Sequence, residues 1–426
     1  MSPTTRSGRR QTVARHGQLR SPHPVSQFFK ILAVSVAVVL VAGIGVVGYN
    51  TWSLFSTLSS NAVELEGQTA APPSIGELEG GFNLLLIGTD ACEEKYAHYF
   101  PGRCSGADAD GELNDVNILV HVSDEPRRVT AVSFPRDLML PIPSCTREDG
   151  STSSAMSKQP LNDAYGYGGL SCVAKTISQL TGENIDYAAK ITWGGVIEVT
   201  NAIGGVEVCV ANGIYDPIYT GLDLAPGMHT LQGIEALEFL RTRHGVGDGS
   251  DLGRISNQQQ YMSRLVKKIV SEDTLSDVGT LYSLATTTVN NVTPSSNLAN
   301  PLTMVQLALT MKGVSFEDIV FVQYPTYTDP DNPNKVVPNR SAADVLFEAL
   351  ALNKQLVITG DVAVNGGVVV VETEQPADPN APADPNAPAD GEAPAQEEIA
   401  ADAVELPSSI TGQNAAQETC SNGNAG

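Results

Sequence analysis

The sequence predicts an α/β domain that lies between a membrane-spanning helix and an acidic tail. Three observations support this fold class. Apolar β-type runs alternate with segments of helical periodicity from about residue 80 to residue 353, which is the pattern of an α/β protein. An uncharged apolar run precedes them at residues 31–49. The chain after Lys354 contains no Lys or Arg and repeats proline and acid, a composition that cannot bury a core.

The first fifty residues predict one membrane span and its orientation. Residues 1–30 form a basic arm without an acid. The uncharged run at residues 31–49 covers about 28 Å as a helix, close to the roughly 30 Å of a bilayer core. The positive-inside rule places the arm in the cytoplasm and the rest of the chain outside the cell membrane, with residues 50–79 as an extracellular linker. A cleaved signal peptide is the alternative, but its apolar region is normally shorter.

The predicted elements of the domain follow from the period of their apolar residues. Strand-like runs lie at residues 83–87, 117–120 and 129–132, and helical spacing occurs at residues 173–180, 193–203, 233–240, 255–269 and 341–350. No Rossmann or Walker fingerprint is present. The tail, residues 354–426, contains an extended linker at 372–408 and a short segment at 410–420 that returns to the domain if its cysteine is bonded.

Six cysteines in a chain expected outside the cytoplasm predict three disulfides. Cys92 and Cys104 flank a short insertion and are in a position to close it. We pair Cys145 with Cys172, which leaves Cys209 with Cys420 and would tie the far C-terminus to the domain. Spacing alone does not decide between the possible pairings, but the last four cysteines lie too far apart for a metal knuckle.

Three arginines, Arg241, Arg243 and Arg254, surround a Gly/Asp loop. Arg241 and Arg243 alternate as on one face of a strand end, and Arg254 and Gln258 are spaced i,i+4 on the following helix, so all four are expected to converge on one pocket. A guanidinium presents a planar fork of donors that matches phosphate oxygens. The alternative is that these arginines form structural ion pairs with Asp248 and Asp251.

Two carboxylates and a fourth arginine sit at strand ends. Asp90 ends one strand-like run, Asp115 begins the next, and Arg136 follows the third. Strand ends are where open α/β sheets bind ligands, and a carboxylate pair there suits Mg²⁺ together with phosphate oxygens. Turn or cap roles are the alternative for both acids. The net charge of -23 argues against nucleic acid as a partner.

These motifs resemble, in order, five blocks of the LytR-CpsA-Psr family, in its actinobacterial type. The blocks read NLLLIGTD, NDVNILVHVSDEPRRVTAVSFPRD, LNDAYGYGG, AIGGVEVCV and RTRHGVGDGSDLGRISNQQ. The resemblance implies that residues 80–353 are a catalytic domain with a mixed central β-sheet flanked by helices. It also implies an apolar tunnel for a polyprenyl chain. Plausible lining residues are Trp193, Val196, Ile197 and Val199, for which core packing is an equal explanation.

The resemblance also implies roles for the site residues. Asp90 and Asp115 correspond to the family's magnesium ligands, and the diphosphate-binding set is Arg136, Arg241, Arg243, Arg254 and Gln258. Arg136, Arg241, Arg243 and Asp115 are the residues expected to act in catalysis. Two positions where the family often has Arg differ here, because they hold Leu113 and Asn257.

The expected activity is that of a membrane-anchored phosphotransferase. By resemblance, it transfers a glycopolymer from a polyprenyl-diphosphate carrier to peptidoglycan with the help of Mg²⁺. Its partners are then the polyprenyl-diphosphate-linked glycan, the peptidoglycan acceptor and membrane lipid. Two alternatives keep the same site: transfer to a surface protein, or pyrophosphatase activity. A third is a non-catalytic sensor of lipid-linked glycan that signals through the cytoplasmic arm, although residues 1–30 have neither the apolar periodicity nor the length to fold.

Overall fold

The computed structural model describes residues 53, 56–69, 80–106, 109–270, 278–311, 313–371 and 403–424. The expected cytoplasmic arm and membrane span lie outside these residues, as does most of the linker expected at residues 372–408. Within the described part of the chain, no helix is long and apolar enough to cross a membrane. The described residues from 56 onward belong to one unit.

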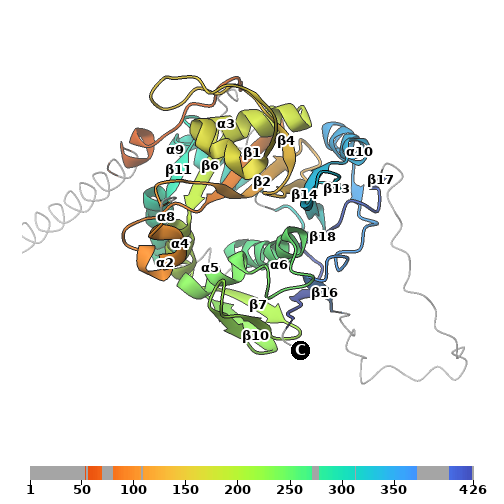
Figure 1. Cartoon of the computed structure of the whole chain (residues 1–426). Coiled ribbons are helices and arrows are strands. Elements are labelled where there is room, and N and C mark those ends of the chain that lie inside the picture. The colour runs from red at the N-terminus through yellow and green to blue at the C-terminus, as the bar shows by residue number, and fades with distance from the viewer. Residues whose placement is uncertain are drawn as a thin grey trace, which may run out of the picture. The chain divides into compact units, whose positions relative to one another are not determined.

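A seven-stranded sheet runs through the centre of this unit, in the order β11-β6-β1-β2-β3-β12-β18 (Figure 1). Its strands are β1 (Phe82–Thr89), β2 (Asn114–Val122), β3 (Val129–Phe134), β6 (Tyr187–Thr192), β11 (Val292–Pro294), β12 (Ile319–Gln323) and β18 (Gly412–Asn414). The β1–β6 and β3–β12 pairs are parallel and the other neighbours are antiparallel. The sheet is therefore mixed, as expected.

Helices cover both faces of this sheet. In β1, Leu85 and Ile87 pack into a cluster with α3 (Ala164–Thr181) and α10 (Arg340–Ala351), whereas Leu84 and Leu86 face a second cluster with α6 (Asp251–Val270) and α9 (Pro301–Met311). Successive side chains of a strand point to opposite faces, so a strand that is apolar throughout requires cover on both sides. The α/β class is confirmed.

All five predicted helices exist. The segment at 193–203 is α4 (Trp193–Ala202) and the segment at 233–240 is α5 (Gly233–Arg241). The other three lie within α3, α6 and α10. Helix α8 (Val278–Asn291) and α9 were not predicted from the sequence.

A second, four-stranded sheet lies beside the first, in the order β10-β7-β19-β16. These strands are β7 (Val206–Val210), β10 (Gly227–Leu231), β16 (Val368–Val370) and β19 (Thr419–Ser421). One face packs on α5 and α6 through a cluster that includes Val208, Phe239 and Tyr261. The hairpin of β8 (Ile214–Asp216) and β9 (Leu222–Leu224) joins the same cluster.

The remaining elements are short and lie around these two sheets. They are β4 (Met139–Ile142), β5 (Met156–Pro160), β13 (Thr326–Asp329), β14 (Asn332–Pro338), β15 (Leu356–Val357), β17 (Val404–Glu405), α2 (Pro101–Cys104) and the 3-10 turns η1 (Ala97–Tyr99), η2 (Leu161–Asp163) and η3 (Phe316–Asp318).

The folded part does not end at residue 353, so the domain boundary expected there is wrong, whereas the segment at 410–420 returns to the domain through the bonded Cys420, as expected. Strands β15 and β16 precede the residues left undescribed, and β17, β18 and β19 follow them. Leu406 and Ile410 are fully buried in the core. Apolar side chains and backbone pairing hold these segments in the fold although they contain no basic residue.

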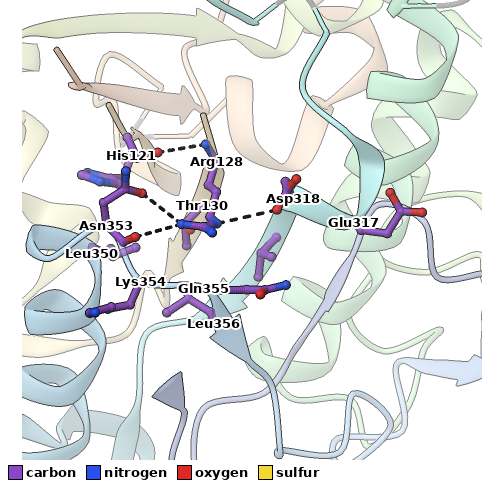
Figure 2. A pocket seen from close by; sticks show the side chains of 12 residues that line it. His121, Arg128, Thr130, Glu317, Asp318, Leu350, Asn353, Lys354, Gln355 and Leu356 are labelled. Carbon is purple, nitrogen blue, oxygen red and sulfur yellow. Dashed lines mark hydrogen bonds and ion pairs between the residues drawn. The ribbon is translucent and has the colours of Figure 1, made fainter. Parts of the chain in front are cut away.

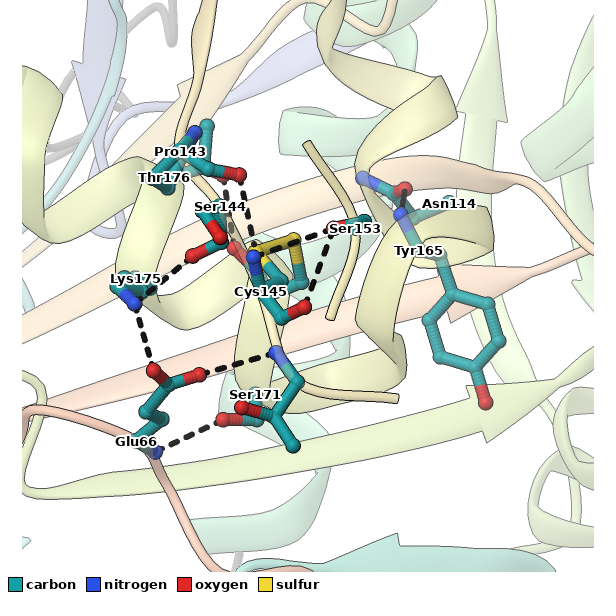
Figure 3. Close-up of a disulfide and its surroundings, with 12 residues drawn as sticks. Glu66, Asn114, Pro143, Ser144, Cys145, Ser153, Tyr165, Ser171, Lys175 and Thr176 are labelled. Carbon is teal, nitrogen blue, oxygen red and sulfur yellow. Dashed lines mark hydrogen bonds and ion pairs between the residues drawn. A yellow bond between two sulfur atoms is a disulfide. The ribbon is translucent and has the colours of Figure 1, made fainter. Parts of the chain in front are cut away.

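The expected linker also reaches into the domain. Leu58 is buried, and the Val63 amide donates to Pro294 O at 2.9 Å. Glu66 forms an ion pair with Lys175 of α3 at 2.8 Å, and its amide donates to Ser171 Oγ at 2.8 Å, beside the Cys145–Cys172 disulfide (Figure 3). Residues 56–69 are therefore packed on α3 and on the chain near β11.

The six cysteines lie as three bonded pairs: Cys92–Cys104, Cys145–Cys172 and Cys209–Cys420. This is the pairing we chose from the sequence. The last pair joins β7 to β19, and so connects chain segments 211 residues apart.

Candidate functional site

Antiparallel pairing brings three of the predicted site residues to one edge of the central sheet. Ile87 of β1 lies opposite Asn117 of β2, which lies opposite Phe134 of β3. The end of β1, the start of β2 and the end of β3 therefore meet. Asp90 follows β1, Asp115 is the second residue of β2, and Arg136 comes just after β3. The parallel partner β6 ends at the same edge, because Thr89 lies opposite Thr192.

Arg241 and Arg243 approach this edge from a helix end. The expectation that they lie at the end of a strand is wrong, because the apolar spacing of α5 carries the helix through Arg241. Thr242 then turns extended, and its buried hydroxyl donates to Asp216 Oδ2 at 2.8 Å. The Thr242 side chain thus points into the core, and both arginines line the cavity described next. Helix α6 begins at Asp251, within the loop expected at residues 245–253.

A cavity of about 520 Å³ lies between the sheet, α4, α5 and α6. Six of the seven predicted site residues line it: Asp115, Arg136, Arg241, Arg243, Arg254 and Gln258. Much of the remaining wall is apolar and includes Leu86, Ile118, Trp193, Val196, Val199 and Leu265. Of the expected tunnel residues, Ile197 is absent from this wall and packs instead against Phe100 and Leu237. The cavity therefore joins a cluster of cations to an apolar chamber.

Arg241 is a cation without an acidic partner among the described residues. Its guanidinium carbon lies 3.8 Å from the ring centre of Trp193 and 4.9 Å from that of Phe100. Burial, with Arg254 nearby, lowers the pKa of Arg241 to about 10, although Asp115 acts in the opposite direction. The Arg243 guanidinium likewise has no hydrogen bond or ion pair to the described chain. Two guanidiniums are thus available to an anionic ligand.

Arg136 and Arg254 are, in contrast, paired. Arg136 donates to Asp115 Oδ1 at 3.0 Å, and Arg254 lies 2.5 Å from Asp251 Oδ1. Burial alone would lower the pKa of Arg136, but Asp115 and Asp251 outweigh it and the pKa is raised. The alternative of a structural ion pair is therefore confirmed for Arg254 with Asp251. It is wrong for Asp248, whose carboxylate accepts a hydrogen bond from the Ser250 amide in its own loop.

Asp90 lies at the site edge but does not line the cavity. One carboxylate oxygen accepts from Arg103 Nε at 2.7 Å and the other from the Leu113 amide at 2.7 Å. Leu113, at a position where the family often has Arg, thus contacts Asp90 through its backbone amide. The other unusual position, Asn257, is fully buried and bonds to Phe239 O and Ser421 Oγ, away from the cavity.

The donor set fits a magnesium ion at Asp115. Mg²⁺ takes one or two carboxylates and completes its octahedron with water and phosphate oxygens. Among the described residues no donor reaches Asp115 Oδ2, and the buried hydroxyl of Thr89, also in the cavity wall, has no hydrogen-bond partner. Asp90 is less open, because Arg103 and Leu113 already use both of its oxygens.

Sequence reasoning missed several residues of this site. Lys190 lines the cavity and bonds to Tyr165 and Glu112 at 2.7 and 2.9 Å; a single lysine in the apolar strand β6 was a usable signal. Tyr219 also lines it and stacks on His244, with ring centres 4.1 Å apart. Arg103 had no local signal, because its contact with Asp90 depends on how the 92–104 loop folds back.

A small second pocket lies at the opposite end of β2 and β3 (Figure 2). Arg128 there donates to Asn353 O at 2.8 Å and pairs with Asp318 at 3.7 Å. His121 Nδ1 lies 2.9 Å from Asn83 Oδ1, and burial lowers the pKa of His121 to about 4. Arg128 is thus paired within the chain, unlike Arg241 and Arg243 of the large cavity.

The LytR_cpsA_psr family matches residues 51–351 of the chain. LcpA of Corynebacterium glutamicum, named a cell wall biosynthesis protein, is 29% identical over 71% of this chain and 60% of its own length. LcpB of the same organism, named a probable cell wall biosynthesis protein, is 28% identical over 63% of this chain and 61% of its own length. The chain therefore spans about three fifths of these two relatives.

Two further comparisons concern other bacteria. Bacillus subtilis TagT, named a polyisoprenyl-teichoic acid–peptidoglycan teichoic acid transferase, is 24% identical over 68% of this chain and 84% of its own length. A crystal structure from Streptococcus agalactiae superimposes with a TM-score of 0.51 at 21% identity, over 64% of this chain and 87% of that one. This superposition shows a shared fold.

Proposed function

The chain belongs to the LytR-CpsA-Psr family, in its actinobacterial type, and from this premise we propose that it is a glycopolymer transferase of cell wall assembly. Its donor is a polyprenyl-diphosphate-linked glycan and its acceptor is peptidoglycan. We place it in the cell membrane with the described domain outside, on the strength of the sequence of residues 1–49.

The observation that carries this proposal is the pair of unpartnered guanidiniums at one side of an apolar cavity. Both side chains are half-buried, and a charge that is partly removed from water without a partner is unfavourable, so such a site favours an anion. Arg241 and Arg243 provide the positive charge for this anion. A small hydrophilic anion alone does not match the apolar wall next to them. A diphosphate attached to a hydrocarbon chain satisfies both features.

The proposed reaction moves a phosphoryl group that carries the glycan. An acceptor hydroxyl, by family resemblance the 6-hydroxyl of a muramic sugar, attacks the phosphorus bonded to the glycan. A new P–O bond forms to the acceptor, the bond from that phosphorus to the bridging oxygen breaks, and polyprenyl phosphate leaves. Arg241 and Arg243 donate to the non-bridging and leaving oxygens, where negative charge increases. Positioning and electrostatics supply most of the rate in such transfers.

We propose that Asp115 receives the acceptor's proton. Arg136 holds one of its carboxylate oxygens and leaves the other available to a hydroxyl in the cavity. Arg254 supports the same residue by donating to the Asp115 backbone oxygen at 3.2 Å. Gln258 donates to Leu240 O at 2.8 Å and so joins α6 to the end of α5, next to Arg241. We assign Arg136, Arg254 and Gln258 to donor binding and to fixing Asp115.

Asp115, with Thr89 and Asp90 beside it, would hold Mg²⁺. When bound, the ion supplies positive charge to the phosphate oxygens.

The test uses the full chain purified in detergent. It is incubated with Mg²⁺, a synthetic polyprenyl-diphosphate glycan and peptidoglycan fragments, and the glycan is followed by mass. We expect glycan phosphate joined to the fragments and one polyprenyl phosphate released per transfer. Asp115→Asn and excess chelator should each reduce this turnover. Binding of donor without turnover would identify a sensor instead, and release of polyprenyl phosphate and free glycan phosphate without transfer to the fragments would identify a pyrophosphatase.

A further inference from the structure

We propose that the loop closed by Cys92–Cys104 forms part of the site and that its Arg103 is a positioning residue for Asp90. The inference rests on the proposed function, since it assigns a role within the same site. Neither Arg103 nor this loop belongs to the five sequence blocks on which the family resemblance depends.

The loop is fixed on α4, a helix that lines the cavity. Glu93 accepts the Gly194 amide at 2.8 Å, and the Tyr96 hydroxyl donates to Glu198. A side chain at Gly194 would overlap with Glu93 and Tyr96, so glycine at this position allows the close approach. The loop is therefore held against α4 at several points in addition to the disulfide.

Two side chains of the loop reach the site residues. Phe100 and Trp193 contact each other with ring centres 4.5 Å apart, and the Arg241 guanidinium lies over both rings, 4.9 Å from the centre of Phe100 and 3.8 Å from that of Trp193. Arg103 pairs with Asp90 at 2.7 Å, and both side chains are largely buried, with 20% and 7% of their surface exposed. One short loop thus contacts a phosphate-binding arginine and a carboxylate of the predicted site.

The disulfide explains why Arg103 stays in this place. Cys104 follows Arg103 directly, and its partner Cys92 lies two residues after Asp90. The bond therefore ties the chain next to the guanidinium to the chain next to the carboxylate. Arg103 supplies from the loop the guanidinium that Leu113 cannot supply from its own position. With the Leu113 amide on the other oxygen, it fixes the orientation of Asp90 beside Thr89 in the cavity wall.

A double-mutant cycle tests whether Arg103 acts through Asp90. We expect Arg103→Gln to lower kcat about tenfold and to change the KM for the lipid-linked donor less than about threefold, because Arg241 and Arg243 still bind the donor. Arg103→Lys should recover part of the loss. In an Asp90→Asn background, Arg103→Gln should cause no further loss, since both changes remove one interaction. Independent, multiplying losses would overturn the positioning role.

The disulfide provides a second arm with a matched control. Replacement of both Cys92 and Cys104 by Ser should lower kcat to a similar extent as Arg103→Gln. Replacement of both Cys145 and Cys172 by Ser removes a disulfide at α3, and Lys95→Gln removes an exposed ion pair of the same loop. Both controls should retain kcat per folded molecule. Circular dichroism and thermal unfolding identify variants that fail to fold. If the cysteine variants do not fold, the kcat values of Arg103→Lys and Arg103→Gln decide whether Arg103 is a positioning residue.

Failure of this inference differs from failure of the proposed function. If the unmodified protein shows no turnover with the donor, the proposed function is wrong. If it turns over and Arg103→Gln has the unmodified kcat and KM, only the role of Arg103 is wrong. A readout independent of turnover is the titration of Mn²⁺ into the protein by electron paramagnetic resonance. Arg103→Gln should change its affinity at least threefold, and an unchanged affinity would count against the positioning role.

Discussion

At the scale of single residues, the site depends on which arginines the fold leaves without an acid. The chain carries 48 acidic residues against 25 basic ones, yet the Arg241 guanidinium lies over the rings of Trp193 and Phe100, and the Arg243 guanidinium has no acidic partner in the described chain. Arg136 and Arg254 are compensated by Asp115 and Asp251. In the proposed function, the first pair therefore provides the binding charge, and the second pair fixes the carboxylate of Asp115.

The first prediction separates charge from geometry at Arg241. Lysine keeps the positive charge but loses the planar fork and the guanidinium contact with the rings of Trp193 and Phe100. We expect Arg241→Lys to lower kcat/KM about ten- to a hundredfold, which corresponds to roughly 1.4–2.7 kcal/mol. The same change at Arg147, in an exposed loop, is the control for general attraction of anions. Equal effects at both positions would show that the Arg241 contact is not specific.

The second prediction concerns pH and His121 at the opposite end of the sheet. Burial lowers the pKa of this group from 6.5 to about 4, so the unfolded chain binds more protons between these values. The stabilising contribution of neutral His121 is complete above about pH 6.5 and is lost as the pH falls toward 4. At about 1.4 kcal/mol per pKa unit, the loss is no more than roughly 3.5 kcal/mol.

Urea unfolding of the unmodified protein and of His121→Gln at several pH values measures this contribution. The difference in unfolding free energy between the two proteins should shrink as the pH decreases through that window. A constant difference would show that His121 titrates with the same pKa in both states.

At the scale of elements, the C-terminal strands support the helix that carries Arg254 and Gln258. Glu418 pairs with Arg264 and Lys267 of α6 at 2.5 and 2.6 Å, and Ser421 donates to Asn257 of the same helix. Strand β19 is paired with β7 and β16, and β18 with β12. Although the C-terminal strands are remote in sequence from α6, they contact one face of this helix, and Arg254 and Gln258 on another face line the cavity.

The third prediction follows from this arrangement. A chain that ends at residue 371 loses β17, β18, β19 and the Cys209–Cys420 bond. Loss of a native disulfide typically costs about 2–5 kcal/mol, and the missing strand contacts add to this. We expect a lower urea midpoint and reduced transfer activity at 37 °C.

The control for this truncation is a chain without residues 378–383, one unit of the proline repeat. Its midpoint should equal that of the unmodified protein. An unchanged midpoint in the truncated chain would mean that the C-terminal strands do not stabilise the domain.

At the scale of the whole molecule, three disulfides join segments that are 12, 27 and 211 residues apart in sequence. Cys145–Cys172 fastens the chain after β4 to α3, next to the Glu66 contact, and Cys209–Cys420 closes the second sheet. Cys92–Cys104 fastens the loop that covers Arg241. Such links persist in oxidising compartments, which agrees with the proposed position of the domain outside the membrane.

The fourth prediction is that the exported protein has no free thiol. Alkylation under non-reducing conditions, followed by peptide mass mapping, should find all six cysteines in the three pairs of the structure. Reduction should lower the thermal midpoint. Free Cys209 and Cys420 in an exported, folded protein would contradict the closure of the second sheet.

The sequence by itself determined the α/β class, the five helices of clear apolar period, the three strands that meet at the site and six residues that line one cavity. These properties depend on local periodicity and on short blocks of polar residues at strand and helix ends. Tertiary structure alone decided that Arg136 and Arg254 are paired while Arg241 and Arg243 are not, that Arg103 reaches Asp90, and that β19 enters the second sheet between β7 and β16. The reason is that these contacts join segments whose separation in space is set by packing and chain closure, for which no local pattern carries information.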